Sequence, residues 1–137
     1  CDWSSDVCSS DLAPTPPGRA SGSFGPTTSY RMDKYTPQLL ERGLLGMIGK
    51  GTRSADVIDA MMRHGAVYFA ATGGAAALIA RSIVQSEVLC YDDLGAEAVR
   101  LLTVVDFPAI VAIDSRGANL YEIGRNKYKI NREKNGG

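Results

Sequence analysis

The chain has 137 residues, of which 45% are hydrophobic and 22% charged, and its 15 lysines and arginines balance 15 aspartates and glutamates. These values are typical of a globular domain, and a chain of this length is expected to form one domain. The zero formal net charge excludes a global field that attracts nucleic acid or a membrane surface, and no apolar run reaches the roughly 18 residues of a membrane helix. Any preference for anions must therefore be local.

The beginning of the chain differs from the rest in composition. Residues 1–12 are similar to the translated read-through of a sequencing adaptor, and residues 13–23 are rich in proline, glycine and serine, which cannot bury a core. We therefore expect residues 1–23 to be a non-native or disordered leader, residues 24–123 to be an N-terminally truncated domain, and residues 124–137 to be a basic flexible tail.

The three cysteines are an odd number without the short spacings of metal ligands. They favour a reducing, cytoplasmic location over a disulfide framework, and we expect no metal ligand on this chain. Cys90 lies in a strand-like segment and is interpreted as a small core residue.

The first predicted helix covers residues 31–42, where apolar residues recur at helical spacing after a run of threonine and serine. Pro37 does not suit its interior, because proline lacks the backbone donor that a helix needs. Gly43 is expected to end the helix in a left-handed conformation. A short buried strand over residues 44–48 follows.

The middle of the chain repeats this alternation of strand and helix. The sequence predicts a helix that Ser54 begins and that ends at His64 and Gly65, then a buried strand over residues 66–71 and a short helix over residues 75–81. Strand, loop and helix in succession predict an α/β layer fold with some parallel pairing.

The last third reads as antiparallel strands. They are predicted over residues 83–91, 100–105, 108–114 and 119–123, with a polar turn between the first two. From Gly124 onwards the basic tail is expected to be frayed and solvated.

Two short loops carry the candidate chemistry. Residues 25–33 read Gly-Pro-Thr-Thr-Ser-Tyr-Arg-Met-Asp, and residues 49–54 read Gly-Lys-Gly-Thr-Arg-Ser. Each loop is rich in hydroxyls, carries a fixed positive charge and opens onto a predicted helix, so each can direct backbone N–H groups and a cation at one anion. The pattern predicts a carboxylate or phosphate site.

The two cations of these loops also have simpler interpretations. Arg31 is either a bidentate carboxylate ligand or a surface arginine paired with Asp33 or Glu41. Lys50 follows a glycine in a loop after a predicted strand, as a P-loop lysine does, but Leu44 stands where that motif has its first glycine, and Gly51 follows Lys50 where serine or threonine is required. Nucleotide binding is therefore not expected.

No complete catalytic apparatus is evident elsewhere in the sequence. His64 is the only histidine and is predicted at a helix end, where it suits the helix dipole. Asp92 and Asp93 are adjacent, so in an extended segment they point to opposite faces. The chain resembles half of a site.

Four motifs resemble the C-terminal (β) part of class I, iron–sulfur fumarate hydratases. They are residues 25–33, Gly-Lys-Gly at 49–51, Thr-Gly-Gly-Ala-Ala-Ala at 72–77 and Asp-Phe-Pro-Ala at 106–109. The β subunits of the related L-tartrate dehydratases share the first two. The resemblance runs from about Phe24 to about Tyr121.

This resemblance implies a swivelling β/β/α domain with a mixed sheet and short flanking helices. It also implies a partner, a separate α subunit or N-terminal domain, which carries a 4Fe–4S cluster on three cysteines, within a hetero- or homo-oligomer. Thr27, Arg31 and Lys50 would then be catalytic, and together with Thr28 they would bind a small dicarboxylate substrate. The free iron would act as a Lewis acid.

The same resemblance implies the reaction, the reversible hydration of fumarate to L-malate. Arg31 and Lys50 would hold the carboxylates and stabilise the aci-carboxylate, and Thr27 would be the proton shuttle. The family supplies a further arginine from an Arg-Asp-x-Ala-His segment, which nothing in residues 1–23 matches. The alternatives are L-tartrate dehydration and a non-catalytic anion-binding module.

Overall fold

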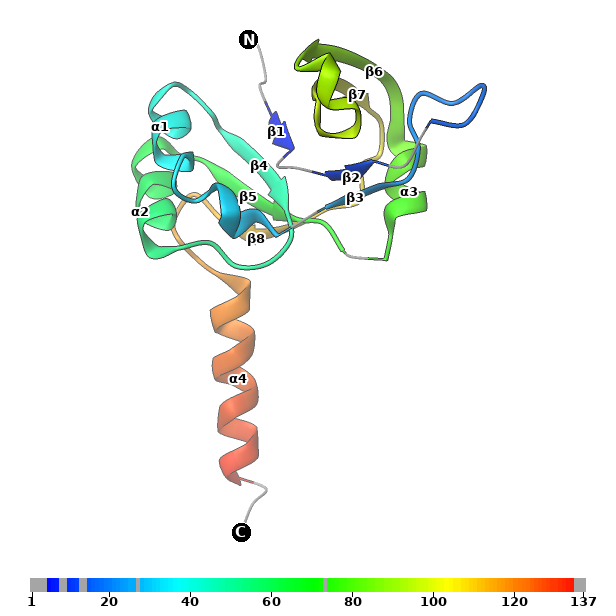
Figure 1. Cartoon of the computed structure of the whole chain (residues 1–137). Helices are drawn as coiled ribbons and strands as arrows, with labels where there is room; N and C mark the ends of the chain where they lie inside the picture. Colours follow the sequence, from blue (N-terminus) through cyan, green and yellow to red (C-terminus); the bar gives the residue numbers. More distant parts are fainter. Residues whose placement is uncertain (1–4, 8–9, 13–14, 27, 73, 135–137) are drawn as a thin grey trace.

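The computed structural model of the chain describes residues 5–7, 10–12, 15–26, 28–72 and 74–134 (Figure 1). The elements in chain order are β1 (Ser5–Val7), β2 (Ser10–Leu12), β3 (Phe24–Pro26), η1 (Ser29–Met32), α1 (Thr36–Glu41), β4 (Gly46–Gly49), α2 (Ala55–His64), β5 (Val67–Ala70), α3 (Ala76–Ser82), β6 (Ile83–Cys90), η2 (Asp92–Glu97), β7 (Val99–Val104), β8 (Ile110–Ile113) and α4 (Leu120–Lys134). The two η elements are 3₁₀ helices.

One half of the molecule is built on a mixed sheet, whose strands come from both ends of the sequence. Its strand order is β1-β4-β5-β8. The pairs β1–β4 and β4–β5 are parallel, whereas β8 runs antiparallel to β5. Helices α1 and α2 pack together beside this sheet (Figure 1). The predicted α/β class with a mixed sheet and short flanking helices is therefore confirmed.

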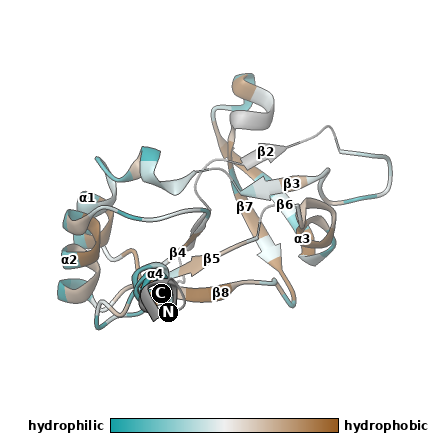
Figure 2. Ribbon diagram, turned by 90° about the horizontal axis from the view of Figure 1, so that it is seen from below, coloured by the Kyte–Doolittle hydropathy of each residue, from teal (hydrophilic) through white to brown (hydrophobic). Residues whose placement is uncertain are grey.

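The main core lies between the sheet and these two helices. Leu40 of α1, Val57 and Met61 of α2, Tyr68 of β5 and Ile113 of β8 are each exposed by 1% or less. In Figure 2 the strands β5 and β8 are coloured mainly as hydrophobic. Burial of each such large apolar side chain contributes about 1.5–3 kcal/mol, so this cluster stabilises the arrangement of β4 and β5.

The other half of the molecule consists of two antiparallel pairs of strands and α3. Strand β2 pairs with β3, and β6 pairs with β7. A smaller buried cluster joins them and contains Phe24, Ala71, Ile79 and Ile83. The antiparallel character predicted for the last third is confirmed.

Helix α2 follows its sequence signals closely. Val57, Ala60 and Met61 recur at three or four residues and are all buried, so they form one apolar face. Ser54 is the N-cap, and Gly65 ends the helix with φ +69°, in the left-handed region where a residue without Cβ is favoured. The predicted bounds of this helix are confirmed.

The single helix predicted over residues 31–42 is wrong. The structure has the 3₁₀ helix η1 and then α1, in which Pro37 is the second residue. In the first turn of a helix the missing N–H of proline has no partner to lose, so proline begins α1 and does not kink a longer helix. Gly43 has φ +101° after α1 and ends it as expected.

The strand predicted over residues 119–123 is also wrong. The segment forms α4, which extends away from the rest of the molecule (Figure 1). The Asn119 side-chain oxygen accepts a hydrogen bond from the Tyr121 amide at 3.0 Å, and the Asn119 carbonyl accepts from Ile123 at 3.0 Å. Asn119 is therefore a helix N-cap, a signal that outweighs the β-rich composition of this segment.

Part of the segment predicted to remain unpacked is packed. Ser21 is buried, and Ala20 lies against the second core cluster. Within the described part of the chain, no helix has the length and apolar character needed to cross a membrane.

Candidate active site

The two loops predicted to form an anion site lie side by side. Thr28 forms a parallel β-bridge with Lys50, and the Ser29 amide donates to the Lys50 carbonyl at 3.0 Å. Strand β4 brings the second loop to this position, because Lys50 follows its last residue. The structure therefore brings together Thr28 and Lys50, two of the four predicted site residues.

The hydroxyl groups of Ser29 and Tyr68 form a buried pair beneath the loops. Ser29 and Tyr68 are both 0% exposed, and their side-chain oxygens are 3.1 Å apart. The Lys50 amide donates to Ser29 Oγ at 3.1 Å, and the Tyr68 hydroxyl donates to the Gly51 carbonyl at 3.0 Å. These hydrogen bonds connect β5 to both loops.

A buried ion pair provides a second connection. Arg53 Nε donates to Asp33 Oδ1 at 2.7 Å, and the two side chains are only 2% and 10% exposed. Arg53 also donates to Thr36 Oγ1 at 2.6 Å, and its guanidinium carbon lies 5.2 Å from the centre of the Tyr68 ring. Asp33 directly follows η1 and Thr36 begins α1, so Arg53 fixes both short helices to the second loop.

The start of α2 already has an internal carboxylate. Asp33 Oδ2 accepts a hydrogen bond from the amide of Ser54, the N-cap residue, at 2.6 Å. A carboxylate at a helix N-terminus is stabilised by the orphan N–H groups and the helix dipole. The Ser54 amide at the end of the second loop is therefore bound by Asp33.

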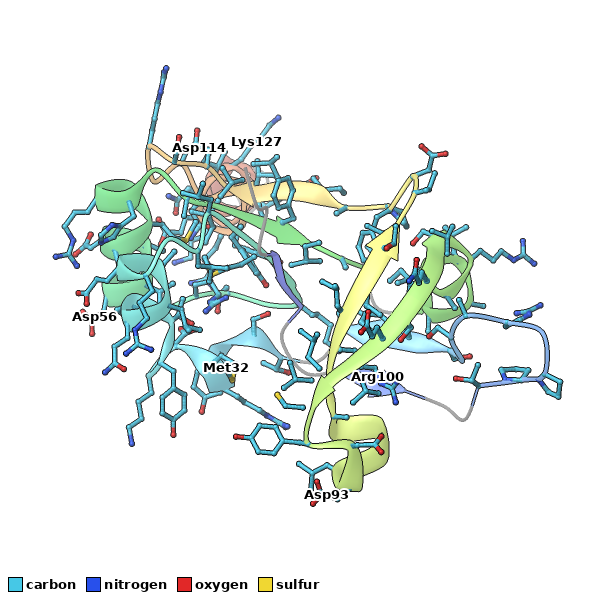
Figure 3. The ribbon with its side chains drawn as sticks, turned by 90° about the horizontal axis from the view of Figure 1, so that it is seen from above. Met32, Asp56, Asp93, Arg100, Asp114 and Lys127 are labelled. Carbon is cyan, nitrogen blue, oxygen red and sulfur yellow. The ribbon has the colours of Figure 1, made fainter. Side chains whose placement is uncertain are left out.

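The predicted cations face solvent. The side chains of Arg31 and Lys50 are exposed, and neither has an ion pair or hydrogen bond with another described residue. Asp33 forms its ion pair with Arg53, and no ion pair between Arg31 and Asp33 is present. Thr28 is partly buried, and Thr27 lies outside the described residues. Figure 3 shows Met32, which follows Arg31, at the end of η1.

We expect Gly49→Ala to lower the free energy of unfolding by about 1–3 kcal/mol, because a Cβ at this buried position would overlap Ser29 Oγ. Urea unfolding of the chain measures this loss. The matched control is Gly46→Ala in the same strand, whose added methyl would meet only Phe69 at 3.9 Å. Equal stability of the two variants would contradict the close approach of Gly49 to Ser29.

Other predicted features lie away from the loops. A shallow hollow between α1 and α2 contains none of the predicted site residues; its lining is Pro37, Asp56, Asp59, Met62 and Arg63. Cys90 is exposed on β6, so its interpretation as a core residue is wrong. Within the described residues, no group of three or more histidine, cysteine or acidic side chains is arranged to hold a metal ion.

Comparison with known sequences places this arrangement in a family. The sequence model of the family described as Fumarase C-terminus matches residues 12–124. The chain belongs to the fumarase C-terminus family. The match begins well before Phe24, where the sequence motifs placed its start, and so includes residues that the sequence assigned to the leader.

Three relatives show how far the similarity extends. This fumarase C-terminal domain is 44% identical over 112 residues to the aerobic class I fumarate hydratase of Escherichia coli K12, covering 80% of this chain and 20% of that protein. It is 42% identical over 121 residues to the anaerobic class I enzyme of the same organism, covering 87% and 22%. A putative L(+)-tartrate dehydratase subunit beta of Methanocaldococcus jannaschii is 40% identical over 104 residues, covering 73% and 53%. The domain thus spans about a fifth of these fumarate hydratases.

Sequence reasoning did not find the residues that organise the loops of this fumarase C-terminal domain. Arg53 was only part of a loop motif, Ser29 only part of a run of helix-capping residues, and Tyr68 only an aromatic member of a buried strand. Opposite charges at Asp33 and Arg53 are a signal in the sequence, but residues 20 positions apart are paired by the fold alone.

Proposed function

We propose that this chain is the C-terminal part of an iron–sulfur hydro-lyase that reversibly hydrates fumarate to L-malate. One observation carries the proposal. In a member of the fumarase C-terminus family, Lys50 is held beside the loop of Arg31, while both side chains are exposed and have no ion-pair or hydrogen-bond partner among the described residues. A dicarboxylate has two anionic groups, which two such cations would bind.

The proposed roles follow from the chemistry of the side chains. The planar guanidinium of Arg31 suits bidentate binding of a carboxylate, and the Lys50 ammonium acts as a point charge. When the proton on the carbon next to a carboxylate leaves, negative charge moves onto that carboxylate, and fixed cations stabilise it. Thr28 would add a hydroxyl contact. Thr27 remains the candidate proton shuttle by family resemblance.

We also propose that the 4Fe–4S cluster is held by a partner subunit or domain. Such a cluster requires several cysteine thiolates, whereas Cys90 stands alone among the described residues and is exposed. The name of the M. jannaschii relative, a subunit beta, supports an enzyme divided between chains. The cysteine usage supports a reducing, cytoplasmic location.

The second candidate is L-tartrate dehydration. The M. jannaschii relative favours it, because the matched region there covers 53% of a protein named as a tartrate dehydratase subunit. Malate and tartrate differ by one hydroxyl, and the residues that distinguish them would lie partly on the partner.

The test is turnover by the chain assembled anaerobically with the cluster-bearing subunit or domain of its own enzyme. We expect fumarate to be converted to malate only when both parts are present. The loss of the ultraviolet absorbance of fumarate measures this conversion. L-Tartrate is the parallel substrate. Turnover of tartrate alone would move the assignment to the second candidate. No turnover of either would leave a non-catalytic anion-binding module.

A further inference from the structure

Both backbone polar groups of Lys50 are bound by one residue, Ser29. The Ser29 amide donates to the Lys50 carbonyl at 3.0 Å, and the Lys50 amide donates to Ser29 Oγ at 3.1 Å. The Tyr68 hydroxyl reaches the next carbonyl, that of Gly51, at 3.0 Å. The backbone on either side of the Lys50 side chain is therefore attached to buried groups.

The glycines beside Lys50 explain why such attachment matters. Gly49 and Gly51 have no Cβ, and Gly51 has φ +90°, a conformation that glycine adopts readily. Glycine is also the residue with the most backbone freedom, so a lysine between two glycines would otherwise sample many orientations. Hydrogen bonds to Ser29 and Tyr68 limit that freedom.

The same hydroxyls set the separation of the two loops. Ser29 is the first residue of η1, the 3₁₀ turn that carries Arg31, and its side chain is 0% exposed. Gly49 approaches Ser29 Oγ so closely that an added Cβ would overlap it. A change at Ser29 would therefore alter the position of Lys50 relative to Arg31.

We propose that Ser29 and Tyr68 are positioning residues for the substrate anion, and that they act through the backbone of Lys50. The inference rests on the proposed function, which assigns a dicarboxylate to Arg31 and Lys50, and extends it to two buried hydroxyls that do not face solvent. A misplacement of about 1 Å in a bound group is enough to lower a rate by roughly 100-fold.

The first test compares Ser29→Ala with Ser82→Ala in the anaerobically assembled enzyme. Ser82 is a matched control, because it is also buried, at 6% exposed, and donates one hydrogen bond, to the Ile79 carbonyl at 2.7 Å, in the other half of the molecule. We expect Ser29→Ala to lower kcat/KM at least about tenfold, and Ser82→Ala to stay within about twofold of wild type. Equal losses would overturn the proposal.

A double-mutant cycle separates positioning from general stability. If Ser29 acts through Lys50, Ser29→Ala should have almost no further effect on kcat/KM in a Lys50→Ala background. The same fold-loss in both backgrounds would show that Ser29 does not act through Lys50, and would overturn the proposal.

Backbone hydrogen exchange tests the attachment without relying on turnover. In Ser29→Ala, and to a smaller extent in Tyr68→Phe, exchange in the peptide covering residues 47–53 should accelerate relative to Ser82→Ala. Tyr68→Phe keeps the ring that faces Arg53 and removes only the hydroxyl. Unchanged exchange in Ser29→Ala would refute the proposal. Inactivity of the wild type on both substrates would instead refute the proposed function.

Discussion

Replacing Arg31 with alanine is expected to reduce transition-state stabilisation by about 2–4 kcal/mol, a loss of roughly 30- to 1,000-fold in kcat/KM for fumarate. The physical reason is that the guanidinium is exposed and has no partner among the described residues, so its charge is available to a substrate carboxylate. The measurement is steady-state kinetics of the anaerobically assembled enzyme.

Two variants make this result specific. Lys34→Ala removes another exposed cation three residues away, whose ammonium lies over the Tyr35 ring at 5.7 Å, and should leave kcat/KM nearly unchanged. Arg31→Lys keeps the charge but loses the planar fork, so it should recover only part of the activity. A normal turnover number in Arg31→Ala, or an equal loss in Lys34→Ala, would contradict the role of Arg31.

Replacing Asp33 with alanine is expected to have the largest effect on stability, a loss of about 3–5 kcal/mol. The variant would leave the Arg53 guanidinium, which is 2% exposed, without its carboxylate, and the Ser54 amide without its acceptor. A domain is stable by only about 5–15 kcal/mol, so this loss is a large fraction of the total. Urea unfolding of the chain measures it.

Asp114→Ala is the control for this second result. The Asp114 carboxylate accepts backbone hydrogen bonds from Arg116 and Ala118, each at 2.9 Å, and has no ion pair within the described part of the chain. Its loss should amount to about 1 kcal/mol. The double variant Asp33→Ala/Arg53→Met should regain part of the stability, because no buried charge is left unpaired. Similar losses in Asp33→Ala and Asp114→Ala would refute the importance of the ion pair.

The two results are connected through η1. Arg31 lies on this short helix, and Asp33, bound to Arg53, immediately follows it. A 3₁₀ helix of four residues has little stability of its own. The position of Arg31 therefore depends on the ion pair as well as on the hydroxyls of Ser29 and Tyr68.

Local signals predicted those parts of the fold in which neighbouring residues decide the structure. Helix α2 has a regular apolar face, a serine at its start and Gly65 at its end, so its bounds were predictable. Near the C-terminal end of the chain, Asn119 caps α4. This helix was predicted as a strand, because one capping residue is a weaker signal than the β-rich composition around it. Pro37 was misjudged for a related reason, because its place in the first turn of α1 depends on where η1 ends.

The sequence by itself determined the two motif loops, the cations Arg31 and Lys50 that they carry, and the family that these motifs indicate. Tertiary structure alone decided which charges are available to a ligand. Asp33 binds Arg53 and not Arg31, and Ser29 binds Lys50 across 21 positions of sequence. The physical reason is that these partners are brought together by two tertiary features, the parallel register of β4 and β5 and the packing of Tyr68 under both loops. The spacing of residues within one loop encodes neither feature.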